Sequence, residues 1–447
     1  PIFASALAIS QGEDPPVVLV TLDSLGIRIE MVDEVARRVA ESHGLPRENL
    51  SIAFTHSHCT PKVDGASDTI FGTPIPADHQ QRITAYTQKL TDDLTEVVRR
   101  AIDARVESRL AWAVGTVGFA ANRRTPGGPV DHALPVLAVF DPAGELRAIH
   151  TSYACHCVTL SYNKINGDWA GYARIAMERR WPGIKGLVSI GCGSDSNPDS
   201  GVTGDSEATA AAQGNQIAKE VERLLDAGLI PLSGAPVAKL ERIPLPFAPL
   251  PTIEQWRALA ERQDPTGHNA RRQLALLEAG TALPDHIDYV IQSFRYGDQL
   301  GMVFLAGEVC ADYALRLKRE LNSEKLWPIA YANDFCAYIP SERLLNEGGY
   351  GGGAEIVYFA LPSTLAAGLE QKIVDQVAAQ LPESWRVPGG TDGVPASDVE
   401  SSRRKFRVDE RFEIRAAAAE PLIADPVAID FGLDGSLWVC EMTDYAR

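Results

Sequence analysis

Two histidines one residue apart, His56 and His58, directly follow an apolar segment that we predict to be a strand at residues 51–55. If the strand continues through the pair, both imidazoles point to the same face, because successive strand side chains alternate between faces. Imidazole nitrogens are common zinc ligands, and a metal site needs several of them on one face. The pair therefore indicates a metal site, although such pairs also occur by chance in many proteins.

A third histidine, His156, lies between two cysteines just after a predicted strand that ends near residue 153. Neighbouring strand residues face in opposite directions, so Cys155 and Cys157 would point away from His156. This alternation argues against a zinc site of the Cys2His type. It favours two buried thiols beside one functional or core histidine.

Three further residues could supply oxygen atoms. Glu308 lies where the apolar segment 302–305 passes into a predicted helix. A carboxylate there is either a metal ligand or a favourable charge at the helix N-terminus. Tyr338, taken alone, is typical of a half-buried aromatic residue. Tyr350 lies in a glycine-rich loop, where it is either a binding residue or an exposed ring.

The elements that must position these residues alternate between strands and helices through the first half of the chain, a pattern typical of strands covered by helices. Consecutive strands at 134–140 and 146–150 predict a partly antiparallel, mixed sheet. A strand at 186–190 enters the loop 191–201 and then a helix at about 206–227, and such units commonly carry catalytic groups. Other predicted elements are strands at 17–22, 109–114, 287–294 and 300–306, and helices at 31–43, 80–106, 252–263, 268–280, 309–321 and 362–381.

The composition excludes several classes of protein. Of the 447 residues, 45% are hydrophobic and 23% are charged, as in globular proteins, and the length allows either one large domain with an appended module or about three domains. The 59 acidic and 42 basic residues give a net charge of −17, a field that repels phosphate backbones and excludes nucleic acid as a partner. No stretch approaches the roughly 18 apolar residues that predict a transmembrane segment. The seven cysteines form no CxxC pairs, so they indicate neither a zinc ribbon nor a disulfide framework.

The end of the chain differs from the rest. Prolines and glycines at 387–400 predict a linker, and short strands are predicted at 412–415, 428–431 and 436–441. The tail 401–447 resembles the opening blade of the β-propeller dehydrogenase-like modules of large bacterial extracytoplasmic proteins. It is too short to close the core of such a module. We expect the natural protein to continue beyond it, and to begin before the first residues, which lack an initiator methionine and a basic leader.

A series of motifs runs through the body of the chain: Thr55-His-Ser-His58, Ala121-Asn-Arg-Arg124, Cys155-His156, Asn163-Lys-Ile-Asn-Gly-Asp-Trp-Ala-Gly-Tyr172, Gly193-Ser-Asp-Ser-Asn-Pro198, Gly307-Glu308 and Ala337-Tyr338-Ile339. In their order and separation these motifs resemble the catalytic domain of the neutral/alkaline non-lysosomal ceramidases. Those enzymes are zinc amidases that hydrolyse the N-acyl bond of ceramide. The resemblance spans about residues 1–385.

The resemblance implies a zinc site whose four ligands are His56, His156, Glu308 and Tyr338. Such a site leaves one position open to water, and zinc lowers the pKa of that water toward neutrality. The resulting hydroxide is a nucleophile strong enough for an amide.

The same resemblance implies roles for other residues. The family's second histidine falls on His58, its Asn-Arg motif on Asn122 and Arg123, and its second functional tyrosine on Tyr350, which follows the ligand tyrosine at the family's spacing of twelve residues. Arg123 and His58 would stabilise the tetrahedral oxyanion or pass its proton to the leaving amine.

The family's active-site serine aligns with Ser196. We interpret Ser196 as a residue that positions the substrate rather than as a nucleophile, because the sequence shows no dedicated base for it, whereas a metal hydroxide would need none. Asp168 is expected to orient His156 or another ligand from behind. Cys59-Thr-Pro61 replaces the family's Ser-Gly-Pro after the histidine pair, so metal ligation follows from the comparison more strongly than ceramide specificity does.

We therefore predict an α/β fold, with an α+β mixed sheet and covering helices, for a zinc hydrolase domain at 1–386, followed by a linker at 387–400 and a truncated β-rich module at 401–447. The predicted reaction is zinc-dependent hydrolysis of an amide of a small-molecule or lipid substrate, with an N-acyl lipid of ceramide type as the candidate. Two alternatives stay open: hydrolysis of an ester or sugar derivative on the same scaffold, and a catalytically silent binding module of a larger multidomain protein. The resemblance implies an extracytoplasmic location, either periplasmic or secreted, and the sequence does not fix the oligomeric state.

Overall fold

The computed structural model describes residues 1–387, 415, 417–418, 426–432, 434 and 436–441. The chain forms two compact units, Pro1–Pro388 and Gly389–Arg447. Residues 388–400 of the predicted linker, and 412–414 of the strand predicted after it, lie outside the described residues.

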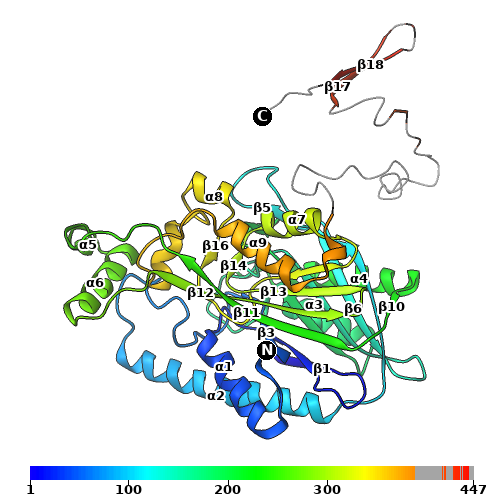
Figure 1. Ribbon diagram of the computed structural model, residues 1–447, viewed down its shortest axis with the longest axis horizontal. Coiled ribbons are helices and arrows are strands. Elements are labelled where there is room, and N and C mark those ends of the chain that lie inside the picture. The colour runs from blue at the N-terminus through cyan, green and yellow to red at the C-terminus, as the bar shows by residue number, and fades with distance from the viewer. Residues whose placement is uncertain (388–414, 416, 419–425, 433, 435, 442–447) are drawn as a thin grey trace. The chain divides into compact units, whose positions relative to one another are not determined.

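The first sheet has three strands, in the order β1 (Ala4–Ile9), β2 (Val17–Leu22) and β3 (Leu50–Phe54). The first pair is antiparallel and the second is parallel. The apolar residues of α1 (Ile29–His43) recur at helical spacing and are buried. Helix α1 packs against the longer α2 (Ala77–Asp103), and both lie along one side of the unit (Figure 1).

The second sheet is mixed, as the sequence predicts. Its strands lie in the order β10 (Ile230–Leu232), β4 (Arg109–Thr116), β6 (Ala133–Phe140), β7 (Leu146–Tyr153) and β8 (Lys185–Ile190). Neighbours are antiparallel except for β7 and β8, which are parallel because the chain crosses over between them. That crossover contains α3 (Asp168–Arg180), which packs against β8 and against α4 (Glu207–Ala227) (Figure 1).

The third sheet comes from the second half of the unit. Its strands lie in the order β11 (Pro236–Pro246), β12 (His286–Tyr296), β13 (Leu300–Leu305) and β15 (Leu326–Ile329), and only the last pair is parallel. The helices of this half are α5 (Ile253–Ala260), α6 (Pro265–Glu278), α7 (Ala311–Glu320), α8 (Glu342–Glu347) and α9 (Leu369–Gln380). Two small two-stranded sheets complete the first unit: β5 (Ala120–Asn122) with β9 (Ser196–Pro198), and β14 (Glu308–Val309) with β16 (Tyr338–Ile339).

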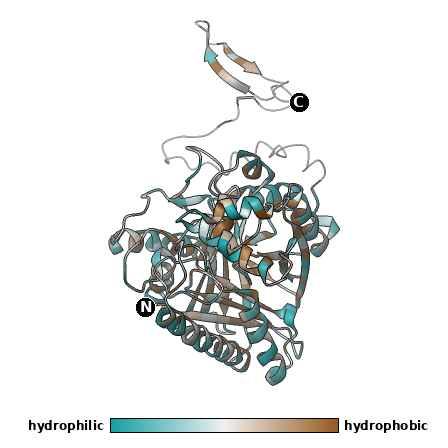
Figure 2. Cartoon of the chain, turned by 90° about the vertical axis from the view of Figure 1, so that its left-hand side faces the viewer, coloured by the Kyte–Doolittle hydropathy of each residue, from teal (hydrophilic) through white to brown (hydrophobic). Residues whose placement is uncertain are grey.

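The segment just after β15 joins the three sheets through backbone hydrogen bonds. The amide of Ala330 donates to the carbonyl oxygen of Ile190 at the end of β8 (2.9 Å), and the amide of Asn333 donates to that of Ile52 in β3 (2.7 Å). The ends of β3, β8 and β15 therefore meet, which is where open α/β sheets place their ligands. Hydrophobic residues concentrate on the strands between the helices, whereas the outer helices are more hydrophilic (Figure 2).

The predicted α/β architecture of the first unit is confirmed. In the second unit, β17 (Pro426–Phe431) and β18 (Leu437–Glu441) form an antiparallel hairpin near two of the predicted strands. None of the described helices is long and apolar enough to cross a membrane.

The seven cysteines all lie among the described residues, and each is a free thiol. Six are buried and Cys440 is exposed. Burial raises the pKa of the Cys155 and Cys157 thiols well above the ordinary value, so both are protonated at neutral pH.

Candidate metal centre

His56 is held at the end of β3 by a turn rather than by the strand. The strand stops at Phe54, and His56 has a left-handed backbone with φ 54°, which is costly for a residue with a side chain. Its Nδ1 donates a hydrogen bond to the carbonyl oxygen of Leu25 (2.7 Å), so Nε2 carries the lone pair. The prediction that the strand continues through the histidine pair is therefore wrong, and the turn instead brings the rings of His56 and His58 to 5.0 Å between centroids.

His156 follows β7 and is fully buried. Its Nδ1 donates to the carbonyl oxygen of Gly193 (3.0 Å), and its backbone amide donates to that of Ser196 (2.9 Å). Burial, and next the charge of Arg123, lower the pKa of His156 to about 4, so the imidazole is neutral, which is the form that binds a metal. A carbonyl on the outer nitrogen of a ligand histidine fixes the tautomer and the orientation of the ring.

Glu308 reaches the same place from the third sheet. Gly307, with φ 73°, makes the turn between β13 and β14, and a Cβ at that position would lie 2.5 Å from the carbonyl oxygen of Ala337. The pairing of β14 with β16 then sets Glu308 beside Tyr338. Glu308 precedes α7, which begins at Ala311, so its carboxylate is not in the first helical turn, as the alternative interpretation required.

The ligand atoms of these three residues converge. Glu308 Oε2 lies 3.3 Å from His56 Nε2 and 3.2 Å from His156 Nε2, and none of the three side chains is more than 2% exposed. Within the described part of the chain these three atoms have no hydrogen-bond partner. Zinc bonds of about 2.0–2.1 Å at tetrahedral angles separate neighbouring ligand atoms by about 3.3–3.4 Å, so the donor set fits a zinc ion.

Charge and solvent access differ across the cluster. Burial alone would raise the pKa of the Glu308 carboxyl, but positive charge and hydrogen-bond donors at the positions of His56 and His156 would hold it well below the ordinary value, so a proton or a cation in the cluster keeps Glu308 anionic. His58 is exposed, and each of the three histidines offers a ring nitrogen within 4.8 Å of those of the other two. His58 thus lies where it could serve as a further ligand or as a group in contact with solvent.

Tyr338, the predicted fourth ligand, lies beside Glu308, but its hydroxyl contacts other residues. It accepts a hydrogen bond from Arg123 Nη2 (3.1 Å) and shares one with the hydroxyl of Tyr350 (2.9 Å). The Arg123 guanidinium also lies 5.0 Å from the centroid of the Tyr350 ring. Burial alone would lower the pKa of Arg123, but Tyr338, Tyr350 and Glu308 hold it above the ordinary value, so the cation is permanent.

Ser196 and Asn122 are paired across the small sheet of β5 and β9. The Ser196 hydroxyl is buried and finds no hydrogen-bond partner among the described residues. Asn122 Nδ2 donates to Asp195 (3.0 Å), whose other carboxylate oxygen accepts from the amide of Ala311 at the start of α7 (2.8 Å). The amide of Arg123 donates to the carbonyl oxygen of Asp195 (2.8 Å), so Asp195, which sequence reasoning missed, holds Asn122 and the Arg123 backbone and ties both to α7.

Asp168 does not lie against His156. Its carboxylate accepts from the backbone amides of Leu160 (2.8 Å) and Trp169 (2.6 Å), and Trp169 Nε1 donates to the carbonyl oxygen of His156 (2.9 Å). Asp168 thus fixes the loop that holds the His156 backbone, rather than the imidazole ring. The Asp168 carboxylate therefore does not contact the His156 ring that it was predicted to orient.

Tyr331 is a second residue that sequence reasoning missed. Its backbone amide donates to the carbonyl oxygen of Gly307 (3.1 Å), and its carbonyl oxygen accepts from the amide of Phe54 (2.9 Å). The Tyr331 ring lies 4.9 Å from that of His56, and φ is 52°. Tyr331 therefore connects the segments that carry two of the candidate ligands, through backbone contacts that leave no signal in the sequence.

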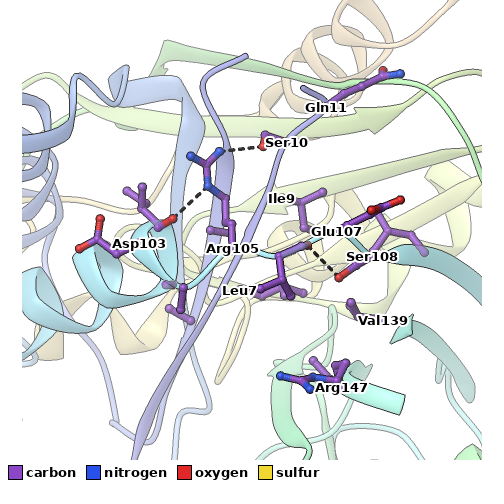
Figure 3. A pocket seen from close by; sticks show the side chains of 18 of the residues that line it. Leu7, Ile9, Ser10, Gln11, Asp103, Arg105, Glu107, Ser108, Val139 and Arg147 are labelled. Carbon is purple, nitrogen blue, oxygen red and sulfur yellow. Dashed lines mark hydrogen bonds between the residues drawn. The ribbon is translucent and has the colours of Figure 1, made fainter. Parts of the chain in front are cut away.

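A surface cavity of about 770 Å³ lies apart from this site, and none of its lining residues belongs to the histidine cluster. It is formed by β1, the end of α2 and the start of β4, and Arg105 in its wall donates to Ser10 Oγ (2.7 Å) (Figure 3). Its charged side chains are of both signs. We assign it no part in the chemistry of the metal centre.

Two solved structures with a similar fold are ceramidases. The crystal structure of neutral ceramidase from Pseudomonas aeruginosa aligns at 17% identity and a TM-score of 0.63, over 86% of this chain and 70% of that one. A ceramidase complexed with C2 aligns at 16% identity and the same TM-score, over 85% of this chain and 70% of that one. The fold of this chain is similar to theirs.

Two other comparisons concern the sequence itself. Residues 398–447 match a family model described as a domain of unknown function, DUF7133. This match does not confirm the resemblance of the tail to a β-propeller module. No curated protein matches the chain.

Proposed function

We propose that this chain is a zinc-dependent hydrolase that cleaves an amide bond, with an N-acyl lipid of ceramide type as the substrate class. One observation carries the proposal: three buried ligand atoms of His56, His156 and Glu308 converge at 3.2–3.3 Å without hydrogen-bond partners in the described chain. Unpaired buried polar atoms are costly, so such a convergence calls for a bound cation.

His56, His156 and Glu308 would hold the ion, with Tyr338 or His58 as a further ligand. Bound zinc supplies a Lewis acid that polarises a carbonyl and lowers the pKa of a coordinated water toward neutrality. The Leu25 and Gly193 carbonyls keep both imidazoles oriented, so the ligands need little rearrangement on loading.

Three other side chains would act on the substrate: Arg123, His58 and Ser196. Arg123 carries a fixed positive charge beside the cluster, where it would stabilise the negative charge that develops on the carbonyl oxygen of the substrate. Desolvation by the surrounding residues holds the pKa of His58 well below the ordinary value, so the ring next to His56 is neutral; it would accept the proton lost by the attacking water and pass it to the nitrogen of the leaving amine. The buried Ser196 hydroxyl would donate a hydrogen bond that positions the scissile group.

The likeness in fold to neutral ceramidases supports an N-acyl amide as the substrate. We assign the activity to residues 1–386 and regard 401–447 as a separate module. An extracytoplasmic location is part of the same proposal, and fractionation of the producing cells tests it.

The experiment is metal analysis by plasma mass spectrometry of the full chain and of His56→Ala and Glu308→Ala. His79→Ala, at an exposed histidine on α2, is the matched control. We expect about one zinc per chain in the wild type and the control, and its loss in both site variants. A chain that cannot be loaded with zinc, or zinc that persists in both site variants, would overturn the ligand assignment.

Matched N-acyl amide and ester substrates then separate the reactions. Hydrolysis of the amide that needs zinc supports the proposal, whereas cleavage of the ester alone supports a different hydrolase on this scaffold. A zinc-loaded chain that cleaves neither substrate would favour the silent binding module.

A further inference from the structure

A glycine-rich loop from Gly348 to Gly353 places Tyr350 next to the metal centre. The Tyr350 ring lies against the Arg123 guanidinium, and its hydroxyl meets that of Tyr338. The residue is nevertheless 47% exposed, so one side of it faces solvent and is open to a substrate. The loop lies outside the three sheets, so the position of the Tyr350 side chain depends on contacts between the loop and the rest of the unit.

Arg124 holds the loop from one side. Its Nη2 donates to the carbonyl oxygen of Gly348 (3.0 Å), its Nη1 donates to that of Tyr350, and the side chain is only 15% exposed. Its backbone amide donates to Asn122 Oδ1 (3.0 Å), so Asn122, itself held by Asp195, fixes the backbone at Arg124. The two adjacent arginines therefore have different partners: Arg123 contacts Tyr338 beside the candidate ligands, and Arg124 contacts the loop.

Glu355 holds the loop from the other side. This carboxylate is 1% exposed, and its two oxygens accept hydrogen bonds from the backbone amides of Gly351 (2.8 Å) and Gly353 (3.2 Å). A carboxylate is buried at such cost that these amides must satisfy it, and the loop is fixed in return. At Gly352 the loop passes so close to α8 that a Cβ would lie 2.3 Å from the carbonyl oxygen of Leu344.

We propose that Arg124 and Glu355 are positioning residues that hold Tyr350 in register with Arg123 for contact with the substrate. Arg124 fixes the carbonyls before and at Tyr350, and Glu355 fixes the amides after it. Neither residue touches the candidate metal ligands. The catalytic consequence of this inference rests on the proposed function. The hydrogen bonds of Arg124 and Glu355 to residues 348–353, which we call the clasp, do not depend on it.

Hydrogen–deuterium exchange of the full chain tests the clasp without any substrate. We expect Arg124→Ala to speed amide exchange at 348–353 by about tenfold or more. Each hydrogen bond from a charged group stabilises the closed loop by more than the free energy of a tenfold change in its opening equilibrium, and the variant loses two of them. Arg343→Ala is the matched control, because both arginines pair with Glu347 (3.1 Å for Arg124 and 2.8 Å for Arg343), but Arg343 donates to Asp312 instead of the loop. Zinc content should stay at the wild-type value in both. Equal exchange in Arg124→Ala and Arg343→Ala would overturn the proposal.

Glu355 is tested by a graded pair of variants. Glu355→Ala removes both acceptors, whereas Glu355→Gln keeps one acceptor oxygen, so we expect faster loop exchange in the first and an intermediate rate in the second. Melting temperatures of the variants report any general loss of fold. Fast exchange spread over the whole unit, rather than confined to 348–353, would contradict a local clasp.

A double-mutant cycle connects the clasp to catalysis. If Arg124 acts through Tyr350, Arg124→Ala lowers kcat/KM about tenfold or more in the wild type and has little effect in the Tyr350→Phe background. An equal loss in both backgrounds would refute the positioning role. If no substrate is hydrolysed at all, the proposed function fails, and the exchange experiment still decides whether the clasp exists.

Discussion

The buried histidine of β7, His150, should make the fold that carries the candidate metal centre less stable in acid. Its side chain is fully buried, and its ring is stacked on Trp327 with 4.7 Å between centroids and 10° between planes. Nε2 shares a hydrogen bond with Ser189 Oγ (2.9 Å). Burial lowers the pKa of His150 to about 3, because no compensating charge supports the cation.

The magnitude follows from proton linkage. In the unfolded chain a histidine has a pKa of about 6.5, so at pH 5 the unfolded state binds a proton that folded His150 does not. Each pH unit below 6.5 then favours unfolding by about 1.4 kcal/mol, which gives about 2 kcal/mol at pH 5. This contribution to stability is fully present above pH 6.5, falls as the pH drops through that value, and stops changing near pH 3.

The test is urea unfolding of the wild type and His150→Gln at pH 7 and pH 5, followed by tryptophan fluorescence, with a chelator to remove metal. Glutamine keeps a hydrogen bond to Ser189 but does not titrate, so the loss of stability between the two pH values should be smaller in the variant by about 2 kcal/mol. The constant effect of losing the stacked ring cancels in this difference. His79→Gln, at an exposed site, should behave as the wild type. The reasoning is refuted if His150→Gln loses as much stability between pH 7 and pH 5 as the wild type does.

Three further substitutions probe the frame of the site. Gly307→Ala adds a Cβ 2.5 Å from the Ala337 carbonyl oxygen at a positive φ, so we expect a loss of about 2 kcal/mol or more in urea unfolding; a neutral result would contradict this geometry. Asp195→Ala leaves the buried amide of Ala311 unpaired and should cost about 1–3 kcal/mol in the same assay, with Asp195→Asn recovering part of it; equal losses would exclude the hydrogen bond as the cause. Tyr338→Phe should weaken zinc about tenfold or more in a chelator competition if the hydroxyl is a ligand, and unchanged affinity would remove Tyr338 from the ligand set.

The sequence predicts the elements around the site well, because their patterns are local. The apolar run at 17–22 and the helical spacing after residue 31 appear in the structure as β2 and α1. The helix predicted at 362–381 is shorter, because α9 begins only after Gly368, whose φ of 90° interrupts a helix. A hydrophobic pattern does not show where a single positive backbone angle, such as that of Gly368, sets the start of a helix.

The site itself was predicted in part. The residues taken singly left structural alternatives open and the ligand set followed from the resemblance of the motifs, and the structure brings His56, His156 and Glu308 together. The strand argument for the histidine pair failed because it assumed extended backbone where His56 turns left-handed. Tyr331 and Asp195 could not be predicted from the sequence, because both form hydrogen bonds with backbone groups distant in sequence. Such contacts depend on how the sheets are joined.

The distribution of thiols has a practical consequence for experiments on the two units. Maleimide reagents attack accessible thiolates, and of the seven cysteines only Cys440, on β18, is exposed. The six buried thiols should stay unmodified while the chain is folded, so one fluorophore would attach to the second unit and none to the first. The dye would then report on the second unit with no engineered cysteine. The chain thus supplies one accessible thiol, and that thiol lies on the second unit.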